Sequence, residues 1–227
     1  GELPKDWKKH TDAMIQAAND AGDKMATRKA SQNMIAALAP VLPEFVGGSA
    51  DLTGSNLTSC SAFEHVSGNK PGNYISYGVR EFGMAAIMNG MALHGGFLPF
   101  GGTFHMFTDY MRNGMRMAAL MKQRVVYVLT HDSIGQGEDG PTHQPIETTA
   151  GIRYIPRMEV WRPCDATEVA AAWTAAVENA ENPTSLVLTR QGTGFNKRSD
   201  SQLADIRKGG YVLSAADGKP DVILIAT

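Results

Sequence analysis

Short apolar or β-branched runs alternate with helical stretches along most of this 227-residue sequence. The runs are EFVGGS, NYISYG, GFLPF, RVVYVLTH, MEVWRP, TSLVLTR and DVILIAT, and most of the intervals between them have helical periodicity. This strand–helix rhythm favours parallel strands, because the crossovers between parallel neighbours place helices over the sheet. We therefore predict an α/β fold with a mainly parallel central sheet and helices on both faces.

The two ends of the sequence differ from this rhythm. Residues 1–26 are polar and lightly amphipathic, which predicts a helical lead-in, and the stretch 27–45 predicts a helix ended by Pro40 and Pro43. The chain begins without methionine and stops within an apolar run that reads as a strand. We therefore interpret it as a piece of a longer polypeptide.

Charge and composition exclude several classes of protein. The formal net charge is −2, with neither sign gathered into a block, so nucleic acid is not an expected partner. Cys60 and Cys164 match no metal-ligand spacing and are too few for a disulfide framework, and no signal peptide opens the chain, which favours a reducing cytoplasm. The stretch 82–108 is long enough to span a bilayer, but we expect buried core and no membrane association, since it contains repeated glycines and Asn89, His94, Pro99 and His105.

Most of the polar chemistry follows directly after the apolar runs. In a parallel sheet the ligand crevice lies beyond the carboxyl ends of the strands. The segments at those positions are GGSADLTGSN, GVREFG, GGTFHMF, HDSIGQGEDGPTH, RPCD and RQGTG. By contrast, the Asn/Gly/Ser-rich segment 60–73 is predicted to be a surface loop.

Glu81 is the last charged residue before a long uncharged stretch that ends at Asp109. It lies where a predicted strand turns into a predicted helix, so the helix dipole favours its carboxylate while apolar surroundings oppose it. Two interpretations remain open from the residues alone. Glu81 is either a buried functional carboxyl or an N-terminal helix charge paired with Arg80.

Three aromatic residues, Phe104, Phe107 and Tyr110, follow a Gly-Gly pair at intervals of three. This spacing predicts that they share one side of the first turns of a helix. Such a stripe is usually core packing. Its place directly after a strand also allows these rings to sandwich a flat ligand.

The loop THDSIGQGEDGPTHQP is dense in titratable side chains: His131, Asp132, Glu138, Asp139 and His143. No pair in it has helical metal-ligand spacing, so a metal site is the less favoured interpretation. Histidine exchanges protons near neutral pH, so a polyol substrate or a proton-transfer step fits this loop better.

Arg28 and Arg190 lie in distant parts of the sequence, one at a helix start and one after a strand. The planar guanidinium suits a phosphate, and the hydroxyl of Ser55 can add a donor. Surface ion pairs are the commoner role for isolated arginines. No phosphate-binding loop of the Walker type is present.

Several ordered motifs resemble the transketolase family: RKASQN, GGSADLTGSN, YGVREFGM, LHGGFLPFGGTF, RMAALMKQ, THDSIGQGEDGPTHQP, WRPCD and LTRQG. The resemblance runs from about Arg28 to the last residue and is specific to the middle, pyrimidine-binding domain. It implies a pyrimidine-binding domain over residues 27–227. The end of this range would continue into the start of a following segment, which is cut at the C-terminus.

The resemblance implies thiamine diphosphate as cofactor. The glutamate that matches Glu81 bonds the pyrimidine N1′ and promotes the 4′-imino form that removes the thiazolium C2 proton. Phe104, Phe107 and Tyr110 match the aromatic residues around the aminopyrimidine, and Asp51 matches a cofactor-side position.

The resemblance also implies transfer of a two-carbon ketol unit from a ketose phosphate to an aldose phosphate, through histidine proton transfers. It places Asp139 on a substrate hydroxyl and His143 beside the reacting carbons. Its sugar-phosphate contacts match Arg28, Ser55, His131 and Arg190.

The other half of the family's site is a Gly-Asp-Gly motif followed by Asn-Asn, which binds diphosphate and Mg²⁺ or Ca²⁺, and neither motif occurs here. The resemblance therefore implies a homodimer in which the partner subunit's diphosphate-binding domain completes the site, and an isolated chain that is inactive. Two alternatives remain. One is a related thiamine-dependent ketol transferase, dihydroxyacetone synthase or 1-deoxyxylulose-5-phosphate synthase, and the other is a catalytically silent dimerisation module.

Overall fold

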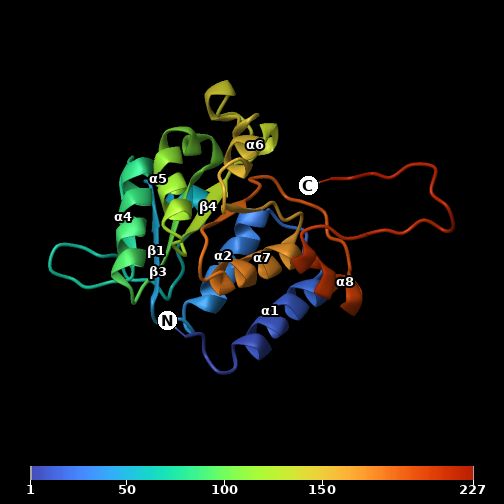
Figure 1. The fold of residues 1–227 in the computed structure, drawn as a ribbon, viewed down its shortest axis with the longest axis horizontal. Helices are drawn as coiled ribbons and strands as arrows, with labels where there is room; N and C mark the ends of the chain where they lie inside the picture. Colours follow the sequence, from blue (N-terminus) through green and yellow to red (C-terminus); the bar gives the residue numbers. More distant parts are fainter. Residues whose placement is uncertain (1, 227) are drawn as a thin grey trace.

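The computed structural model describes residues 2–226, and six parallel strands form one sheet with helices on both faces (Figure 1). The sheet order is β2-β1-β3-β4-β6-β5, and every neighbouring pair is parallel. The predicted α/β class and parallel sheet are confirmed. The strands are β1 (Phe45–Ser49), β2 (Tyr74–Ser76), β3 (Leu98–Phe104), β4 (Val126–Thr130), β5 (Glu159–Trp161) and β6 (Thr184–Val187).

Each central strand is buried on both faces because its residues alternate between two apolar clusters. In β4, Val126 and Val128 face one cluster, and Tyr127 and Leu129 face the other. All of β1, β3, β4 and β6 is buried, as expected for strands covered on both sides. This burial explains why the apolar runs identified the strands.

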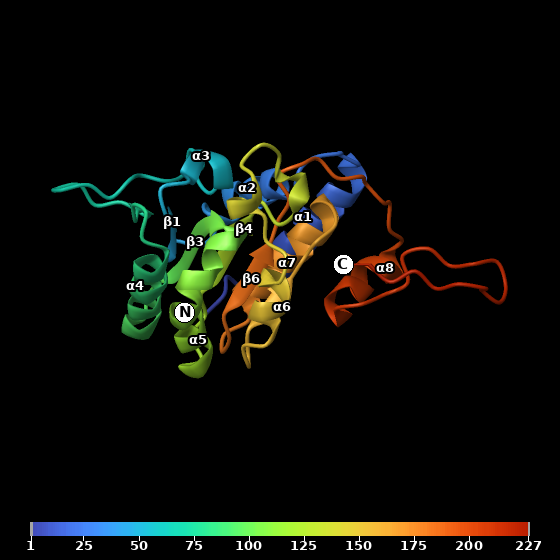
Figure 2. The same cartoon turned by 90° about the horizontal axis from the view of Figure 1, so that it is seen from above.

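One face of the sheet is covered by α1 (Trp7–Ala21), α2 (Thr27–Leu38) and α7 (Ala166–Glu178), which lie together in Figure 2. The predicted N-terminal helices are confirmed, and α2 ends two residues before Pro40. Trp7 and Met14 of α1 are buried in this layer, and the Trp7 indole donates to Glu178 Oε1 at 2.8 Å. The first helix is therefore packed into the same core as the sheet.

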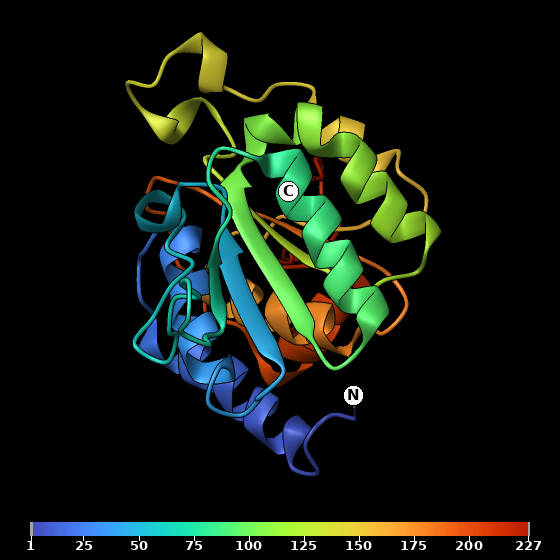
Figure 3. The same cartoon turned by 90° about the vertical axis from the view of Figure 1, so that its left-hand side faces the viewer.

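The other face is covered by α4 (Glu81–His94), α5 (Thr108–Leu120) and α6 (Thr148–Arg153). Figure 3 shows α4 and α5, in green, running beside each other over the strands. They approach closely because a Cβ at Gly114 would lie only 2.6 Å from the Cβ of Ala85. The stretch 82–108 is thus α4 followed by β3. The inner side of α4 and all of β3 are buried, as predicted, but the outer side of α4 is exposed at Phe82, Ile87 and Leu93. Within residues 2–226, no helix is both long and apolar enough to cross a bilayer.

The sheet order places a switch point between β1 and β3. From β1 the chain passes through the short helix α3 (Thr53–Asn56) and the exposed loop 60–73 to β2 at one edge, then returns through α4 to β3 on the other side of β1. Ligand crevices form where the strand order reverses, beyond the carboxyl ends of the strands. The predicted site segments all follow those ends.

The C-terminal run DVILIAT was predicted to be a strand, and this is wrong for residues 221–226, which have no regular structure and are exposed. Thr227 lies outside the described residues. An extended segment becomes a strand only by pairing with a neighbour, and no strand of this sheet pairs with it. Figures 1 and 2 show the chain after α8 (Asp200–Asp205) leaving the layered core as a long loop.

Residues 198–211 are held against the core mainly by Arg198, whose side chain is fully buried. Arg198 Nη1 lies 2.6 Å from Asp165 Oδ2, and Nη2 lies 2.9 Å from Glu168 Oε1. Asn19 of α1 exchanges hydrogen bonds with the backbone N–H and C=O of Arg198, both at 3.0 Å. The Tyr211 hydroxyl donates to Glu168 at 2.6 Å. The two sequence-distant helices α1 and α7 are therefore both tied to residues 198–211.

Candidate functional site

Glu81 is the first residue of α4, directly after the β2 strand and its turn, and its side chain is buried, with the residue only 1% exposed. Oε1 accepts a hydrogen bond from the Thr103 hydroxyl at 3.2 Å. Oε2 is buried and has no hydrogen-bond partner in the described chain. Arg80 turns away, since its Nη1 donates to the Tyr77 carbonyl at 3.0 Å, and no ion pair joins it to Glu81 in the described chain. One buried carboxylate oxygen is thus available to a group outside this chain.

The aromatic residues Phe104, Phe107 and Tyr110 form a connected row. The Phe104 and Phe107 rings are stacked with centroids 6.0 Å apart, and those of Phe107 and Tyr110 are 6.4 Å apart. Exposure increases along the row, from 6% at Phe104 to 51% at Tyr110. An apolar wall therefore leads from the buried end of β3 to the surface.

The prediction that these three rings share the first turns of one helix is wrong. Phe104 is the last residue of β3, where it pairs with Thr130 of β4, and Phe107 ends the one-turn helix η1 (His105–Phe107). Only Tyr110 lies in α5, which begins at Thr108. Spacing could not show this, because β3 continues through its glycines up to Phe104 before the chain turns.

Both loop histidines contact this wall. The His131 ring stacks on Phe104 with centroids 3.8 Å apart and an interplanar angle of 26°. The His143 ring stands edge-on to Phe107 at 5.3 Å and to Phe104 at 6.1 Å. The structure therefore brings the histidine loop and the aromatic row together.

Burial, followed by the charge of Arg28, lowers the pKa of His131 from its ordinary 6.5 to about 4, although Asp139 opposes this shift. His131 is only 4% exposed and has a positive φ of 61° directly after β4. Its imidazole is consequently neutral at pH 7. A neutral ring is compatible with the nearby guanidinium groups, whereas a cation would be repelled.

Arg28 and Arg190 approach from opposite ends of the sequence. Burial, followed by the charge of Arg190, lowers the pKa of Arg28 below its ordinary value, so two like charges face the same region. Arg28 Nη1 donates to the Ser55 backbone carbonyl, and its buried Nε has no partner in the described chain. Arg190 lies 3.9 Å from exposed Glu138. Paired guanidinium groups with an unused buried donor suit an anion such as phosphate.

Asp51 and Asp139 are both exposed. Asp51 follows β1 with a positive φ of 65° and makes no hydrogen bond or ion pair with the other predicted site residues in the described chain. Asp139 lies near enough to His131 to affect its pKa. Asp51 therefore lies beyond the same carboxyl ends of the strands as the rest of the site, without a hydrogen bond to it.

Sequence reasoning missed three buried polar residues that support the site: Thr103, Asn56 and Thr130. Thr103 bonds Glu81, and Asn56 Nδ2 donates to Thr130 Oγ1 at 2.7 Å. Thr130 in turn lies 2.9 Å from His131 Nδ1. The available signal was position, since Thr103 and Thr130 each directly precede a predicted site residue at a strand end.

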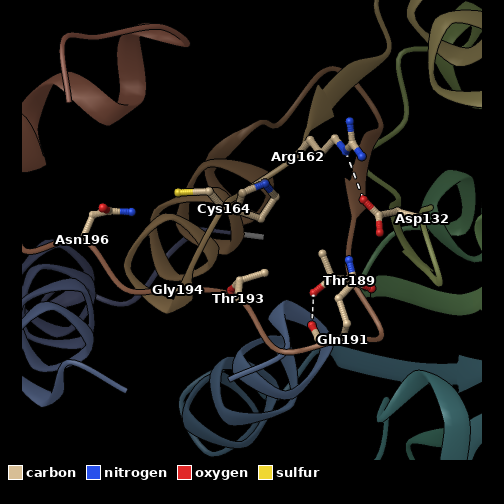
Figure 4. A pocket seen from close by; sticks show the side chains of 9 residues that line it. Asp132, Arg162, Cys164, Thr189, Gln191, Thr193, Gly194 and Asn196 are labelled. Carbon is tan, nitrogen blue, oxygen red and sulfur yellow. Dashed lines mark hydrogen bonds and ion pairs between the residues drawn. The ribbon is translucent and has the colours of Figure 1, made fainter. Parts of the chain in front are cut away.

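A cavity of about 380 Å³ lies beside Asp132, the residue after His131 (Figure 4). Figure 4 shows Asp132 and Arg162 facing each other beside it, with Oδ2 and Nε 3.0 Å apart. It is lined by Asp132 of the histidine loop and by residues of the predicted segments RPCD and RQGTG, and none of the three aromatic residues lines it. Across residues 2–226, no three His, Cys, Asp or Glu side chains are grouped as a metal site would require.

Comparison with known families matches residues 23–194 to the family described as transketolase, pyrimidine binding domain. Transketolase 1 of Vibrio vulnificus is 55% identical over 228 residues, and a protein of Cupriavidus necator named "Transketolase, plasmid" is 58% identical over 227 residues. Each alignment covers 100% of this chain and 34% of the relative. The chain therefore spans about a third of the length of these relatives.

Solved structures give the same match. A transketolase from Pichia stipitis in complex with sedoheptulose 7-phosphate has a TM-score of 0.87 and 42% identity, over 96% of this chain and 32% of that one. Transketolase from Leishmania mexicana has a TM-score of 0.85 and 43% identity over the same shares. A split-gene transketolase described as an inactive β4 tetramer is 27% identical with a TM-score of 0.62, over 78% of this chain and 56% of that chain.

Proposed function

The chain belongs to the transketolase family as a pyrimidine-binding domain, and we propose that it forms the pyrimidine half of a thiamine diphosphate site. The proposed enzyme transfers a two-carbon ketol unit from a ketose phosphate to an aldose phosphate, as in the pentose phosphate pathway. The observation that carries this proposal is the buried, unpartnered Oε2 of Glu81 at the start of α4.

The residues present fit an aminopyrimidine. A buried carboxyl oxygen without a partner requires a donor or acceptor from outside the chain, and a ring nitrogen supplies one. The row formed by Phe104, Phe107 and Tyr110 offers flat apolar surface to the ring. When bound, thiamine diphosphate would supply a thiazolium carbon acid whose deprotonated C2 is nucleophilic toward a ketose carbonyl.

Glu81 then acts by holding a proton at Oε2, while the Thr103 hydroxyl fixes Oε1 and thereby orients the carboxyl group. Both Glu81 and Thr103 are buried, so water does not compete for the hydrogen bond between them. Asp51, exposed at the end of β1, is proposed as a cofactor-side contact.

For the substrate, we propose that Arg28, Arg190 and His131 bind the phosphate, with Ser55 beside Arg28. His143, held edge-on to the aromatic row, is the proposed proton donor and acceptor at the reacting carbons. Asp139 on the same exposed loop is the proposed partner of a substrate hydroxyl.

The diphosphate and its Mg²⁺ or Ca²⁺ ion are proposed to be held by a separate domain, supplied by the partner subunit of a homodimer. Tyr110 at the open end of the aromatic row is half exposed, and apolar side chains continue from it over the outer faces of α4 and α5. These are Phe82, Ile87, Leu93, Met117 and Leu120, each at least 42% exposed. Such a surface is typical of a face that packs against a partner.

We keep the division into a lead-in (1–26) and a pyrimidine-binding domain (27–227) as a proposal, supported by the family match beginning at residue 23. A cytoplasmic location is proposed on the cysteine usage, and both cysteines are free thiols. Nucleic acids and membranes are not proposed partners.

The test uses the assembled enzyme, meaning this domain together with a diphosphate-binding domain of a transketolase. We expect this chain alone to be inactive, and the mixture to transfer ketol units in the presence of thiamine diphosphate and Mg²⁺. If the mixture forms a complex but shows no activity, the domain is a silent dimerisation module. Profiling both donors and acceptors separates transketolase from dihydroxyacetone synthase and 1-deoxyxylulose-5-phosphate synthase.

A further inference from the structure

A continuous chain of buried hydrogen bonds leads from β1 to His131. The Ser49 hydroxyl lies 3.0 Å from Asn56 Oδ1, Asn56 Nδ2 lies 2.7 Å from Thr130 Oγ1, and Thr130 Oγ1 lies 2.9 Å from His131 Nδ1. Ser49, Asn56 and Thr130 are 0% exposed. Water therefore cannot replace any of these hydrogen bonds.

Asn56 is held tightly in this position. It ends α3, and a Cβ on Gly102 of β3 would lie 3.2 Å from Asn56 Oδ1, so the amide fits only because Gly102 has no side chain. The Ser49 hydroxyl accepts from the Leu52 N–H at 3.1 Å, which leaves its own proton to donate. That proton has two acceptors within reach, Asn56 Oδ1 at 3.0 Å and the Gly102 carbonyl at 3.1 Å, and the Gly102 carbonyl also accepts from the Ala50 N–H. Asn56 Oδ1 is the closer of the two acceptors and receives no other hydrogen bond in the described chain.

These partners favour one donor-to-acceptor direction along the series of hydrogen bonds. Asn56 Oδ1 accepts from Ser49, so its amide group donates to Thr130 Oγ1. Thr130 Oγ1 accepts from the Asn56 amide, and its own hydroxyl proton can be donated to His131 Nδ1, 2.9 Å away. A neutral imidazole whose Nδ1 accepts must carry its proton on Nε2.

We propose that Asn56 and Thr130 are positioning residues that hold His131 as the neutral tautomer protonated at Nε2, which makes it a hydrogen-bond donor toward an anion. His131 Nε2 makes no hydrogen bond to the part of the chain that the structure describes. Arg28 and Arg190 both act electrostatically on this ring, so an anion bound between them meets an N–H rather than a lone pair. The anion in question is the substrate phosphate, so this role rests on the proposed function.

The tautomer itself is measurable in this chain without cofactor or substrate. We would record long-range ¹H–¹⁵N spectra of the uniformly labelled chain at pH 7 and assign His131 from the signals lost in His131→Gln. The expected pattern has a protonated Nε2 and an unprotonated Nδ1. A protonated Nδ1, or an even mixture of the two tautomers, would overturn the proposal.

Two matched variants test whether the hydroxyl sets the tautomer. Thr130→Val keeps the side-chain shape and removes the donor, so the His131 signals should move to a mixture of tautomers. Thr130→Ser retains the hydroxyl and should keep the pattern of the unsubstituted chain. An unchanged pattern in folded Thr130→Val would show that the chain of hydrogen bonds does not control His131. If Thr130→Val fails to fold, the spectrum of the unsubstituted chain still decides the assignment.

Kinetics of the assembled enzyme separate this proposal from the proposed function. Thr130→Val should raise KM for a phosphorylated donor by about tenfold, the size expected for one hydrogen bond to a charged group, while KM for hydroxypyruvate stays within about twofold. Thr130→Ser should restore the lower KM. Equal effects on both donors would overturn the positioning role. An inactive unsubstituted assembly would instead refute the proposed function, and the tautomer measurement would stand independently of it.

Discussion

The Thr103 hydroxyl of β3 donates a hydrogen bond to Oε1 of Glu81 at the start of α4, at 3.2 Å. Phe104, the next residue after Thr103, begins the aromatic row and stacks on His131. One strand end therefore positions the carboxyl group, the aromatic wall and a loop histidine together. This arrangement depends on β3 lying beside the switch point of the sheet.

Removal of the Thr103 hydroxyl should misorient Glu81 without changing its charge. We expect Thr103→Val to lower kcat of the assembled enzyme by about tenfold, since one buried hydrogen bond is lost. Thr103→Ser should retain most of the activity. If Thr103→Val has the same kcat as the unsubstituted enzyme, the hydrogen bond has no role in orienting the carboxyl.

Replacement of Arg190 should act on phosphate binding. Arg190→Ala is expected to raise KM for a phosphorylated donor by roughly 10–100-fold, and to change KM for hydroxypyruvate little, because only the former carries the anion. Steady-state kinetics with both donors checks this. The matched control is Arg153→Ala on the far end of α6. Equal increases in KM for the two donors would exclude Arg190 from the phosphate site.

The ion pairs of Arg198 with Asp165 and Glu168 should contribute to the free energy of unfolding of this chain. Arg198→Met leaves the buried Asp165 and the partly buried Glu168 without their cation, which should lower the free energy of unfolding by about 3–5 kcal/mol. Lys197→Met removes an exposed pair with Asp20 and one hydrogen bond to the Asn19 carbonyl, and should cost about 1 kcal/mol. Urea unfolding followed by circular dichroism measures both. Equal effects of the two substitutions would show that the buried cluster adds nothing.

His105 predicts a pH dependence of stability. Burial, followed by the charge of Arg162, lowers the pKa of this fully buried histidine from 6.5 to about 4. Between those values the unfolded chain binds a proton that the folded chain excludes, so stability falls as the pH drops from 6.5 to 4. This histidine alone should account for about 3 kcal/mol.

The control for this pH effect is His105→Gln, which can still bond the Thr149 hydroxyl that His105 Nε2 contacts at 2.8 Å. Urea midpoints of His105→Gln measured from pH 7 to pH 4 should fall less steeply than those of the unsubstituted chain. His65→Gln, on the exposed loop, should leave the slope unchanged. Identical slopes for all three chains would contradict the assignment to His105.

The sheet was predictable because strands buried on both faces appear in sequence as short continuous apolar runs. The same rule failed for residues 221–226, because strand formation also needs a neighbouring strand, which a run of residues cannot reveal. The positions of Glu81 and the loop histidines at strand ends followed from the α/β rule. Thr103, Asn56 and Thr130 did not, because Thr103 bonds Glu81 and Asn56 bonds Thr130 across long sequence separations, which local patterns do not show.

The most direct test of the central claim concerns the proton handled by Glu81. In the assembled enzyme saturated with thiamine diphosphate, acid quenching and NMR give the rate at which the cofactor C2 proton exchanges with deuterium. Glu81→Gln should slow this exchange by about 10²–10⁴-fold, while Glu181→Gln, an exposed residue before β6, should leave it unchanged. Exchange at the unsubstituted rate in a folded, cofactor-bound Glu81→Gln enzyme would contradict the account.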